Sequence, residues 1–319
     1  MNPDHNHQSN RRLPKAVRLI LLALAGISSL AVLIVLLGAL TFAIVNRTNG
    51  KIISSGETRR YLLHVPKNID PAQPVPLVIT IHGFAQWPAN QANVSQWNPI
   101  ANREGFIVVY PSGTGFPKRW LAFPQQSKAD SKDVVFISDL IDSLSAQYNI
   151  DPSRIYVNGL SNGGGMTFLL GCELADRIAA TGSVGGAFVL PMEECSSSRP
   201  VPLIAFHGTA DPIVPFHGGP SGGFDLPFPD IPQWMSARAA LNGCSTTPDP
   251  LPASGVVSGV RYTGCLEDAE VVFYTIAGGG HTWPGGNPLP ERITGLTTQD
   301  ISASETMWQF FELNSLFDN

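Results

Sequence analysis

The sequence predicts an α/β domain with a mostly parallel sheet covered by helices on both faces, preceded by one N-terminal transmembrane helix. Three observations predict this fold class. Short runs of β-branched and aromatic residues alternate with segments of helical spacing. Polar, glycine-containing loops directly follow several of these runs. An uncharged stretch of 27 residues, 19–45, precedes all of them.

Composition limits the classes of protein that the chain can belong to. Its 319 residues are 43% apolar and carry a net charge of −5, which allows one large domain or two small ones. The basic residues form no cluster outside the N-terminus, so nucleic-acid binding is not expected. Residues 1–50 carry a net charge of +4, which leaves −9 for residues 51–319.

The stretch 19–45 is expected to anchor the chain in a membrane, because a bilayer needs only about 20 apolar residues to be spanned. The basic residues before it predict that the N-terminal side stays cytoplasmic: Arg11, Arg12, Lys15 and Arg18. A cleaved signal peptide is the alternative, although its apolar core is typically about 7–15 residues long. The anchor places the rest of the chain on the extracytoplasmic side, and cleavage would instead secrete it.

The chain is expected to divide into a basic tail (1–18), the anchor (19–45), a linker (46–58) and one catalytic α/β domain (59–319). Strands are expected at 60–65, 77–82, 106–110, 155–158, 203–207 and 271–276. Helices are expected at 98–104, 131–148 and 302–311. The Gly/Pro-rich segment 218–234 is too irregular for a strand and is expected to form a rim over the site.

Ser161 lies at the centre of Gly159-Leu160-Ser161-Asn162-Gly163, between an apolar run and a helix-like segment. G-x-S-x-G between a strand and a helix is the signature of a nucleophile elbow. The serine of an elbow occupies a strained turn, so the residues two positions away crowd the backbone and are best without a Cβ. Because a Gly/Ser/Asn-rich stretch is otherwise an ordinary turn, the prediction depends on partners elsewhere in the chain.

A serine nucleophile needs a base and an acid that orients the base. Asp211 follows the strand expected at 203–207, and His281 follows the strand expected at 271–276. The order Ser161, Asp211, His281 is that of α/β-hydrolases. Each residue alone has an ordinary reading as a turn or loop residue. Together, in this order and at strand ends, they predict a catalytic triad.

An oxyanion hole needs two amide donors. The amide of Asn162 follows the serine, and the loop after His82 is expected to supply the second donor from Phe84. His82 and His207 each precede a glycine at a strand end. We expect both histidines to support their loops through hydrogen bonds rather than to act in the chemistry.

The chain has four cysteines: Cys172, Cys195, Cys244 and Cys265. An even number in an exported domain favours disulfides, and of three connectivities we favour the sequence-local pairs Cys172–Cys195 and Cys244–Cys265. Each would close roughly twenty residues, for about 3 kcal/mol in the chain-entropy model. A zinc site is the alternative, although no C-x-x-C or H-x-x-x-H spacing occurs. A cysteine nucleophile is less favoured than Ser161.

Several motifs together resemble one family: GLSNGGGM, HGTADPIVPF and GGGHTWPGG, with IHGF upstream and IDPSRIYVNG before the serine. They look like the secreted esterases that include poly(3-hydroxybutyrate) depolymerases, feruloyl and acetylxylan esterases, and mycobacterial-type lipoprotein hydrolases. The likeness covers roughly residues 55–315, and GGGHTWPGG is its most specific part.

The resemblance implies an α/β-hydrolase fold, the triad Ser161, Asp211 and His281, the oxyanion amides of Phe84 and Asn162, and the cysteine pairing given above. The chain departs from the family in two ways. Phe84 stands where many members carry Cys or Gly, which narrows the site. The anchor is unlike freely secreted members, and the sequence lacks the substrate-binding domains of polymer depolymerases, which argues against a crystalline polymer substrate.

We therefore expect a membrane-tethered serine ester hydrolase that needs neither metal nor cofactor. Its substrates would be short-chain acyl, hydroxyalkanoate-oligomer, or feruloyl and acetyl sugar esters. Trp283, Phe216 and Phe84 are candidates for an apolar wall beside the acyl or aryl group, with core packing as the alternative for each. Rival hypotheses are an acyltransferase or peptidase with the same triad, and a non-catalytic anchored ligand-binding domain.

Overall fold

The computed structural model describes residues 14–122, 131–221 and 224–316. Helix α1 (Lys15–Val45) is 31 residues long, covers the stretch expected as an anchor, and is the one helix of these residues that is long and apolar enough to cross a membrane. At the end of α1 the chain divides into two compact units, and the second, an α/β unit, begins at Val45.

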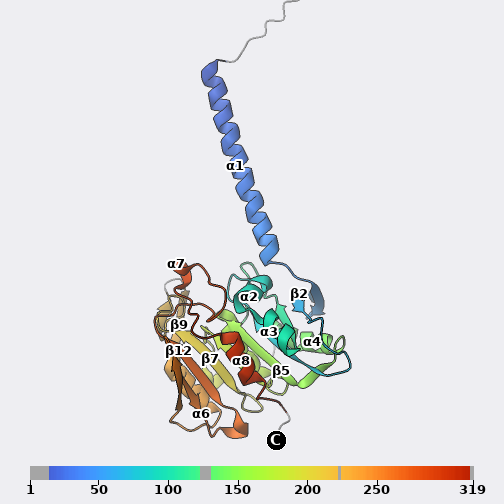
Figure 1. The fold of residues 1–319 in the computed structure, drawn as a ribbon, viewed down its shortest axis with the longest axis vertical. Coiled ribbons are helices and arrows are strands. Elements are labelled where there is room, and N and C mark those ends of the chain that lie inside the picture. The colour runs from blue at the N-terminus through green and yellow to red at the C-terminus, as the bar shows by residue number, and fades with distance from the viewer. Residues whose placement is uncertain (1–13, 123–130, 222–223, 317–319) are drawn as a thin grey trace, which may run out of the picture. The chain divides into compact units, whose positions relative to one another are not determined.

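The α/β unit is built on a sheet of 10 strands in the order β1-β2-β4-β3-β5-β6-β7-β12-β11-β10 (Figure 1). The strands are β1 (Gly50–Ser54), β2 (Glu57–His64), β3 (Val75–Ile81), β4 (Ile107–Pro111), β5 (Ile150–Leu160), β6 (Ala180–Val184), β7 (Leu203–Gly208), β10 (Asp249–Ser254), β11 (Val257–Tyr262) and β12 (Val271–Ile276). Neighbours from β4 through β12 pair in parallel, whereas β1, β2, β10 and β11 pair antiparallel. The parallel strands therefore share one carboxyl edge.

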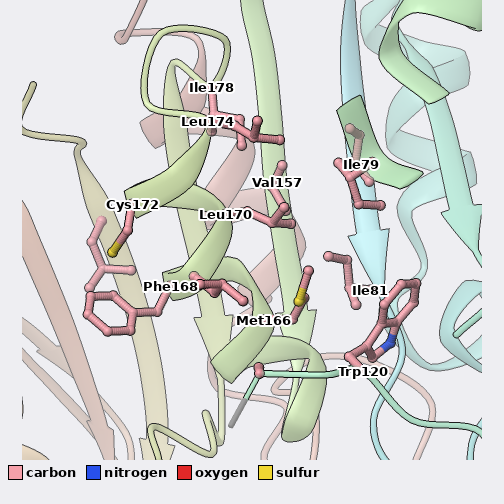
Figure 2. Packing of buried hydrophobic residues seen from close by; sticks show 14 of the residues in the cluster. Ile79, Ile81, Trp120, Val157, Met166, Phe168, Leu170, Cys172, Leu174 and Ile178 are labelled. Carbon is pink, nitrogen blue, oxygen red and sulfur yellow. The ribbon is translucent and has the colours of Figure 1, made fainter. Parts of the chain in front are cut away.

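Helices cover both faces of this sheet (Figure 1). The helices of the α/β unit are α2 (Pro88–Ser95), α3 (Trp97–Glu104), α4 (Lys132–Ser145), α5 (Asn162–Glu173), α6 (Ile231–Leu241), the one-turn α7 (Glu291–Thr294) and α8 (Ala303–Phe311), with 3-10 turns η1 (Met192–Glu194) and η2 (Leu266–Asp268). Strand side chains alternate between the faces. On one face Ile79 and Val157 pack with α4 and α5, and Figure 2 shows Met166 and Leu170 of α5 facing them. On the other face α2, α3 and α8 enclose a second core, in which Tyr156 stacks on Phe311 at 4.8 Å.

The predicted fold class is confirmed, and each expected strand and helix overlaps an observed one. The largest difference is at β5, which begins five residues before the strand expected at 155–158. The range 46–58, expected as a linker, instead contains β1 and the start of β2. Ile52 alternates with exposed neighbours and packs against the core, so this short segment adds an edge strand by pairing with β2. The sequence pattern was too short to reveal it.

The expectation that the segment 218–234 is too irregular for a strand is also wrong. Its described residues contribute to β8 (His217–Ser221) and β9 (Phe224–Asp230), which pair antiparallel in a separate two-stranded sheet, and to the start of α6. The pairing accommodates glycine because Gly218 and Gly219 have φ of 73° and 98°, and its register shifts between Gly219 and Ser221. An edge pair of this kind tolerates prolines, since one side of each strand needs no ladder hydrogen bond.

Candidate active site

Ser161 occupies the sharp turn between β5 and α5. Its φ of 59° and ψ of −121° are strained for a residue with a Cβ. The chain crosses itself closely here, because a Cβ on Gly159 would lie 2.5 Å from the Gly163 carbonyl carbon, and one on Gly163 would lie 2.3 Å from the Ile81 oxygen. Only glycine fits at both positions, which gives G-x-S-x-G its steric basis.

The backbone of Ser161 is held from the neighbouring strand. Its N–H donates to the Val184 oxygen at 2.9 Å, and its carbonyl accepts from Gly165 and Ala187 at 2.9 and 3.0 Å. The strained turn is therefore fixed by β6 and by the loop that follows β6. The side chain of Ser161 lies partly exposed at the carboxyl edge of the sheet.

Asp211 and His281 come from the loops after β7 and β12, and the structure brings them together. The Nδ1 of His281 lies 2.7 Å from Asp211 Oδ2, and both residues are buried. A carboxylate only accepts hydrogen bonds, so Nδ1 carries the proton and Nε2 is the acceptor. The other carboxylate oxygen accepts the N–H groups of Ile213 and Val214, each at 2.8 Å, which fixes the Asp211 side chain.

The charge state of Asp211 follows from these contacts. Burial would raise the pKa of this carboxyl, but the charge of His281, its hydrogen bond and the nearby His207 together hold the pKa below its usual value. Asp211 is therefore a carboxylate wherever the protein is folded near neutral pH.

Two glycines, Gly185 and Gly83, allow Asp211, His281 and the loop after β3 to approach the turn at Ser161. Gly185 follows β6 with φ of 52°, and a Cβ on it would lie 3.0 Å from His281 Nδ1 and 3.4 Å from Asp211 Oδ2. A Cβ on Gly83 would lie 3.3 Å from the Ser161 Cβ. The pair Asp211–His281 and the elbow thus meet at the end of β6. Within the described part of the chain, no hydrogen bond joins the Ser161 hydroxyl to His281.

His82 and His207 support their loops, in the way expected from the sequence. His82 Nδ1 donates to the Gly83 oxygen at 2.8 Å, and its Nε2 accepts the Gly113 N–H at 3.0 Å. His207 Nε2 donates to the Val214 oxygen at 2.9 Å and lies 3.4 Å from Asp211 Oδ2. Burial lowers the pKa of both, that of His82 to about 4, so His82 stays neutral at neutral pH.

The two expected oxyanion donors lie on adjacent segments. Asn162 is the first residue of α5, so its amide is among those that have no partner inside the helix. Phe84 lies in the loop after His82, with its side chain 36% exposed. This loop is held by the Gly83 N–H, which donates to Gln86 Oε1 at 3.1 Å.

Trp120 is a site residue that the sequence reasoning missed. Its backbone N–H donates to Asn162 Oδ1 at 2.7 Å, and its carbonyl accepts from Asn162 Nδ2 at 3.2 Å. Its indole N–H donates to the His82 oxygen at 3.0 Å. One buried residue therefore connects the two segments that carry the expected oxyanion donors, through its backbone on one side and its indole on the other. No motif marks it, because its partners are distant in sequence.

Replacing Trp120 by phenylalanine is expected to lower kcat about tenfold with less than a twofold change in KM. Removing a complete oxyanion donor costs about 10²–10³ in kcat, and loosening one costs less. Steady-state kinetics with p-nitrophenyl acetate measures the effect. The matched control is Trp308→Phe, because Trp308 is buried on α8 and its indole nitrogen has no partner among the described residues. Equal losses in both variants would contradict the assignment.

Trp283 and Phe216 lie in the core. Trp283 is 1% exposed and its indole N–H donates to Ser304 Oγ at 3.0 Å. Phe216 is buried and stacks near Phe273 with ring centroids 6.3 Å apart. This burial favours the packing alternative for both residues, and a substrate-binding role for them stays a prediction.

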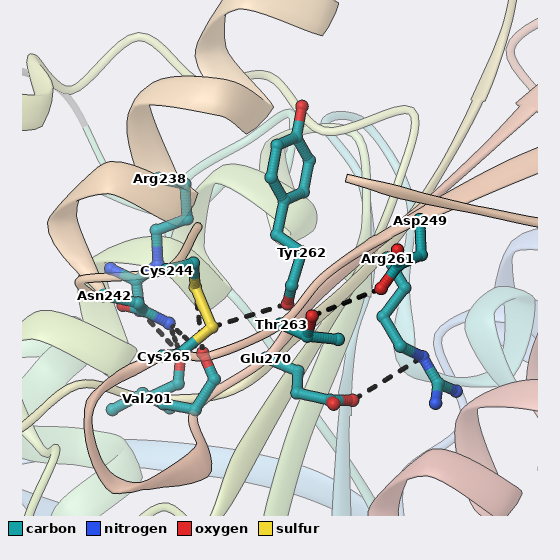
Figure 3. Close-up of a disulfide and its surroundings, with 11 residues drawn as sticks. Val201, Arg238, Asn242, Cys244, Asp249, Arg261, Tyr262, Thr263, Cys265 and Glu270 are labelled. Atoms are coloured by element: carbon teal, nitrogen blue, oxygen red, sulfur yellow. Dashed lines mark hydrogen bonds and ion pairs between the residues drawn. A yellow bond between two sulfur atoms is a disulfide. The ribbon is translucent and has the colours of Figure 1, made fainter. Parts of the chain in front are cut away.

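The structure pairs Cys172 with Cys195 and Cys244 with Cys265. Figure 3 shows the second disulfide beside Arg238 and Asn242, which both donate to the Val201 oxygen at 2.9 and 3.0 Å. All four cysteines are thus oxidised, as suits an extracytoplasmic domain. Within the ranges that the structure describes, no three His, Cys, Asp or Glu side chains form a metal-binding group.

The fold and the elbow define an enzyme of the α/β-hydrolase class. Residues 60–213 match the model of the family described as Esterase PHB depolymerase. The protein named "Putative esterase NocK" of Nocardia uniformis subsp. tsuyamanensis is 30% identical over 284 residues, which cover 82% of each chain. Feruloyl esterase C of Emericella nidulans is 25% identical over 84% of this chain and 86% of its own. The chain belongs to the Esterase PHB depolymerase family and is an esterase.

A solved structure agrees with this fold. The structure titled "Acetyl xylan esterase from Aspergillus awamori" superposes with a TM-score of 0.58 at 16% identity, over 82% of this chain and 98% of that one. The relatives confirm the family resemblance and the enzyme class predicted from the sequence, and the solved structure confirms the fold class.

Proposed function

We propose that the esterase cleaves its substrate through a serine acyl-enzyme, with Ser161 as nucleophile, His281 as base and Asp211 as the acid that orients His281. The observation that carries this proposal is the 2.7 Å contact between His281 Nδ1 and Asp211 Oδ2 beside a strained Ser161. It leaves Nε2 of His281 as the proton acceptor. Catalytic hydrogen bonds commonly tighten only when substrate binds, so the Ser161–His281 contact belongs to the substrate complex.

The reaction would follow from these positions. Ser161 Oγ attacks the ester carbonyl carbon while His281 Nε2 takes its proton. The amides of Phe84 and Asn162 stabilise the negative charge on the carbonyl oxygen, at the N-terminus of α5. His281 then protonates the departing alcohol, and the acyl group stays on Ser161. Water, deprotonated by His281, attacks the carbonyl carbon of the acyl-enzyme, and His281 returns the proton to Ser161 Oγ as the acid leaves.

The substrates we propose are short-chain acyl esters, hydroxyalkanoate oligomers, and feruloyl or acetyl esters of sugars. A relative named feruloyl esterase and a structural neighbour named acetyl xylan esterase support the sugar esters. The family description supports hydroxyalkanoate esters. Phe84 stands partly exposed in the loop beside Ser161 and would offer the acyl or aryl group an apolar contact.

We also propose that α1 anchors the catalytic unit on the extracytoplasmic side of a membrane. The support is its length, its lack of charged residues after Arg18, and the two disulfides in the unit that follows. Secretion after cleavage within this helix is the alternative. In both cases the catalytic domain at 59–319 meets its substrate outside the cytoplasm.

The test combines hydrolysis with covalent labelling of the full chain in detergent. The substrate panel is p-nitrophenyl butyrate, methyl ferulate, acetylated xylan and the trimer of 3-hydroxybutyrate. Diethyl p-nitrophenyl phosphate is expected to label the peptide that contains Ser161, and Ser161→Ala to abolish labelling and turnover. The control Ser198→Ala changes an exposed serine and should retain both.

Four results would contradict the proposal. Labelling at another residue would displace Ser161 as nucleophile. Faster acyl transfer to an added alcohol than to water would identify a transferase, and cleavage of peptides without ester turnover a peptidase. Binding of an ester without turnover or labelling would indicate a non-catalytic domain.

A further inference from the structure

A hollow of about 250 Å³ lies on the sheet edge that also carries Ser161. It is lined by residues 57–60 at the start of β2, by 112–115 after β4, and by Lys118. Because β2 runs antiparallel to β4, with Tyr61 opposite Pro111, the start of β2 lies beside the carboxyl end of β4. The hollow therefore opens at the edge where substrates bind to parallel sheets.

The charges around this hollow do not balance. Glu57 pairs with Lys132, and Arg59 pairs with Asp133 at 2.7 Å. Two cations remain, Arg60 and Lys118, for which no carboxylate partner occurs among the described residues. This excess of positive charge stands out in a unit whose residues 51–319 carry a net −9.

Lys118 is positioned to receive an anion. Its ammonium donates to the Gly113 oxygen at 3.1 Å, which uses one of its three N–H donors. The side chain is half-buried, and burial, followed by the charges of Arg59 and Arg60, lowers its pKa. A bound anion would relieve this repulsion among like charges.

The hollow is connected to the oxyanion loop by two hydrogen bonds. The Lys118 oxygen accepts the Ala85 N–H at 2.8 Å, and the Gly113 N–H donates to His82 Nε2 at 3.0 Å. Strands β4 and β5 are separated only by β3, so the hollow and Ser161 lie on the order of 10 Å apart along the edge. A substrate of modest length can reach both.

We propose that this hollow is a subsite for a carboxylate on the substrate, so that the esterase prefers esters with a free carboxylate at a distance from the scissile carbonyl. Lys118 and Arg60 would bind the carboxylate by charge-assisted hydrogen bonds. Carboxylate-ended oligoesters of hydroxy acids and uronate-bearing sugar esters share this chemistry. The inference rests on the proposed ester hydrolysis at Ser161.

The test compares p-nitrophenyl monoesters of the straight-chain diacids from succinate to sebacate with their methyl-capped counterparts, using the full chain. We expect kcat/KM to favour the carboxylate form by about tenfold at one chain length, a preference that rising KCl reduces. Lys118→Gln and Arg60→Gln should each remove most of that preference and change turnover of the methyl-capped esters less than twofold. Lys67→Gln is the matched control, because Lys67 is an exposed lysine in the loop at the opposite end of β2.

The outcomes separate the subsite from the proposed reaction. Absence of turnover with every ester would contradict the reaction at Ser161. Turnover with equal kcat/KM for carboxylate and capped esters at all lengths would overturn the subsite alone, as would equal losses in Lys118→Gln and Lys67→Gln. Titration calorimetry of Ser161→Ala with pimelate and with galacturonate measures binding without turnover. Pimelate stands for the carboxylate-ended oligoesters and galacturonate for the uronate-bearing sugar esters, so the two heats distinguish these sources. Loss of the observed heat in Lys118→Gln is expected, and an unchanged heat would contradict the proposal.

Discussion

Replacing Asp211 by asparagine is expected to lower kcat by about 10⁴ while the protein stays folded. Asp211 Oδ1 accepts two backbone N–H groups, from Ile213 and Val214, so the oxygen of an asparagine would take that position. Its amide nitrogen would then face His281 Nδ1, which must become an acceptor. The proton of His281 moves to Nε2, and this tautomer cannot accept the proton of Ser161.

The measurement is kcat for p-nitrophenyl butyrate, with Asp176→Asn as the control because Asp176 is exposed. A second readout is the pH dependence of unfolding. The pKa of Asp211 is lowered in the folded state, so the carboxylate contributes stability above its unfolded pKa of about 3.9, and this contribution disappears as the pH falls through the folded value. The stability difference between wild type and Asp211→Asn should therefore shrink below about pH 4. A kcat within tenfold of wild type would contradict the role of Asp211.

The strand ends explain why so much of the fold and candidate site could be predicted. Three largely apolar runs are each followed within two residues by glycine, and then by one chemically distinctive residue: Ile155–Asn158, Leu203–His207 and Val271–Ile276. In a parallel sheet those three ends meet at one edge, so chain order alone predicts the approach of Asp211 and His281. Their 2.7 Å contact agrees with that expectation.

Contacts between segments without local patterns could not be predicted. Trp120 connects Asn162 to His82, although neither partner is near it in sequence. Gly185 permits the approach of His281 through a positive φ, and nothing in Val184-Gly185-Gly186 distinguishes it from an ordinary turn. Strand β10 forms one edge of the sheet and β11 lies next to it, and both expose several side chains, so their hydrophobic periodicity is weak.

Arg59 and Asp133 form a buried ion pair whose disruption should have the largest effect on stability. Arg59 Nη2 lies 2.7 Å from Asp133 Oδ1, with side-chain exposures of 5% and 0%. The guanidinium also lies 3.9 Å above the Phe136 ring. Removal of one partner leaves the other buried and uncompensated, which costs about 3–5 kcal/mol. We expect that loss for Arg59→Met, measured by guanidinium unfolding followed by tryptophan fluorescence.

The double variant Arg59→Met/Asp133→Asn tests whether the loss comes from the unpaired charge. It should be less destabilised than the sum of the single variants, because no buried charge remains and the asparagine oxygen can still accept the Leu121 N–H, now 2.8 Å from Asp133 Oδ2. Arg154→Met breaks a partly exposed pair with Asp151 and should cost less than about 1 kcal/mol. Since Leu121 follows Trp120, Asp133→Ala should also lower kcat by loosening the segments that carry the proposed oxyanion amides of Phe84 and Asn162. Additive single losses, or equal losses for Arg59 and Arg154, would show that burial of the charges does not set the stability of this edge.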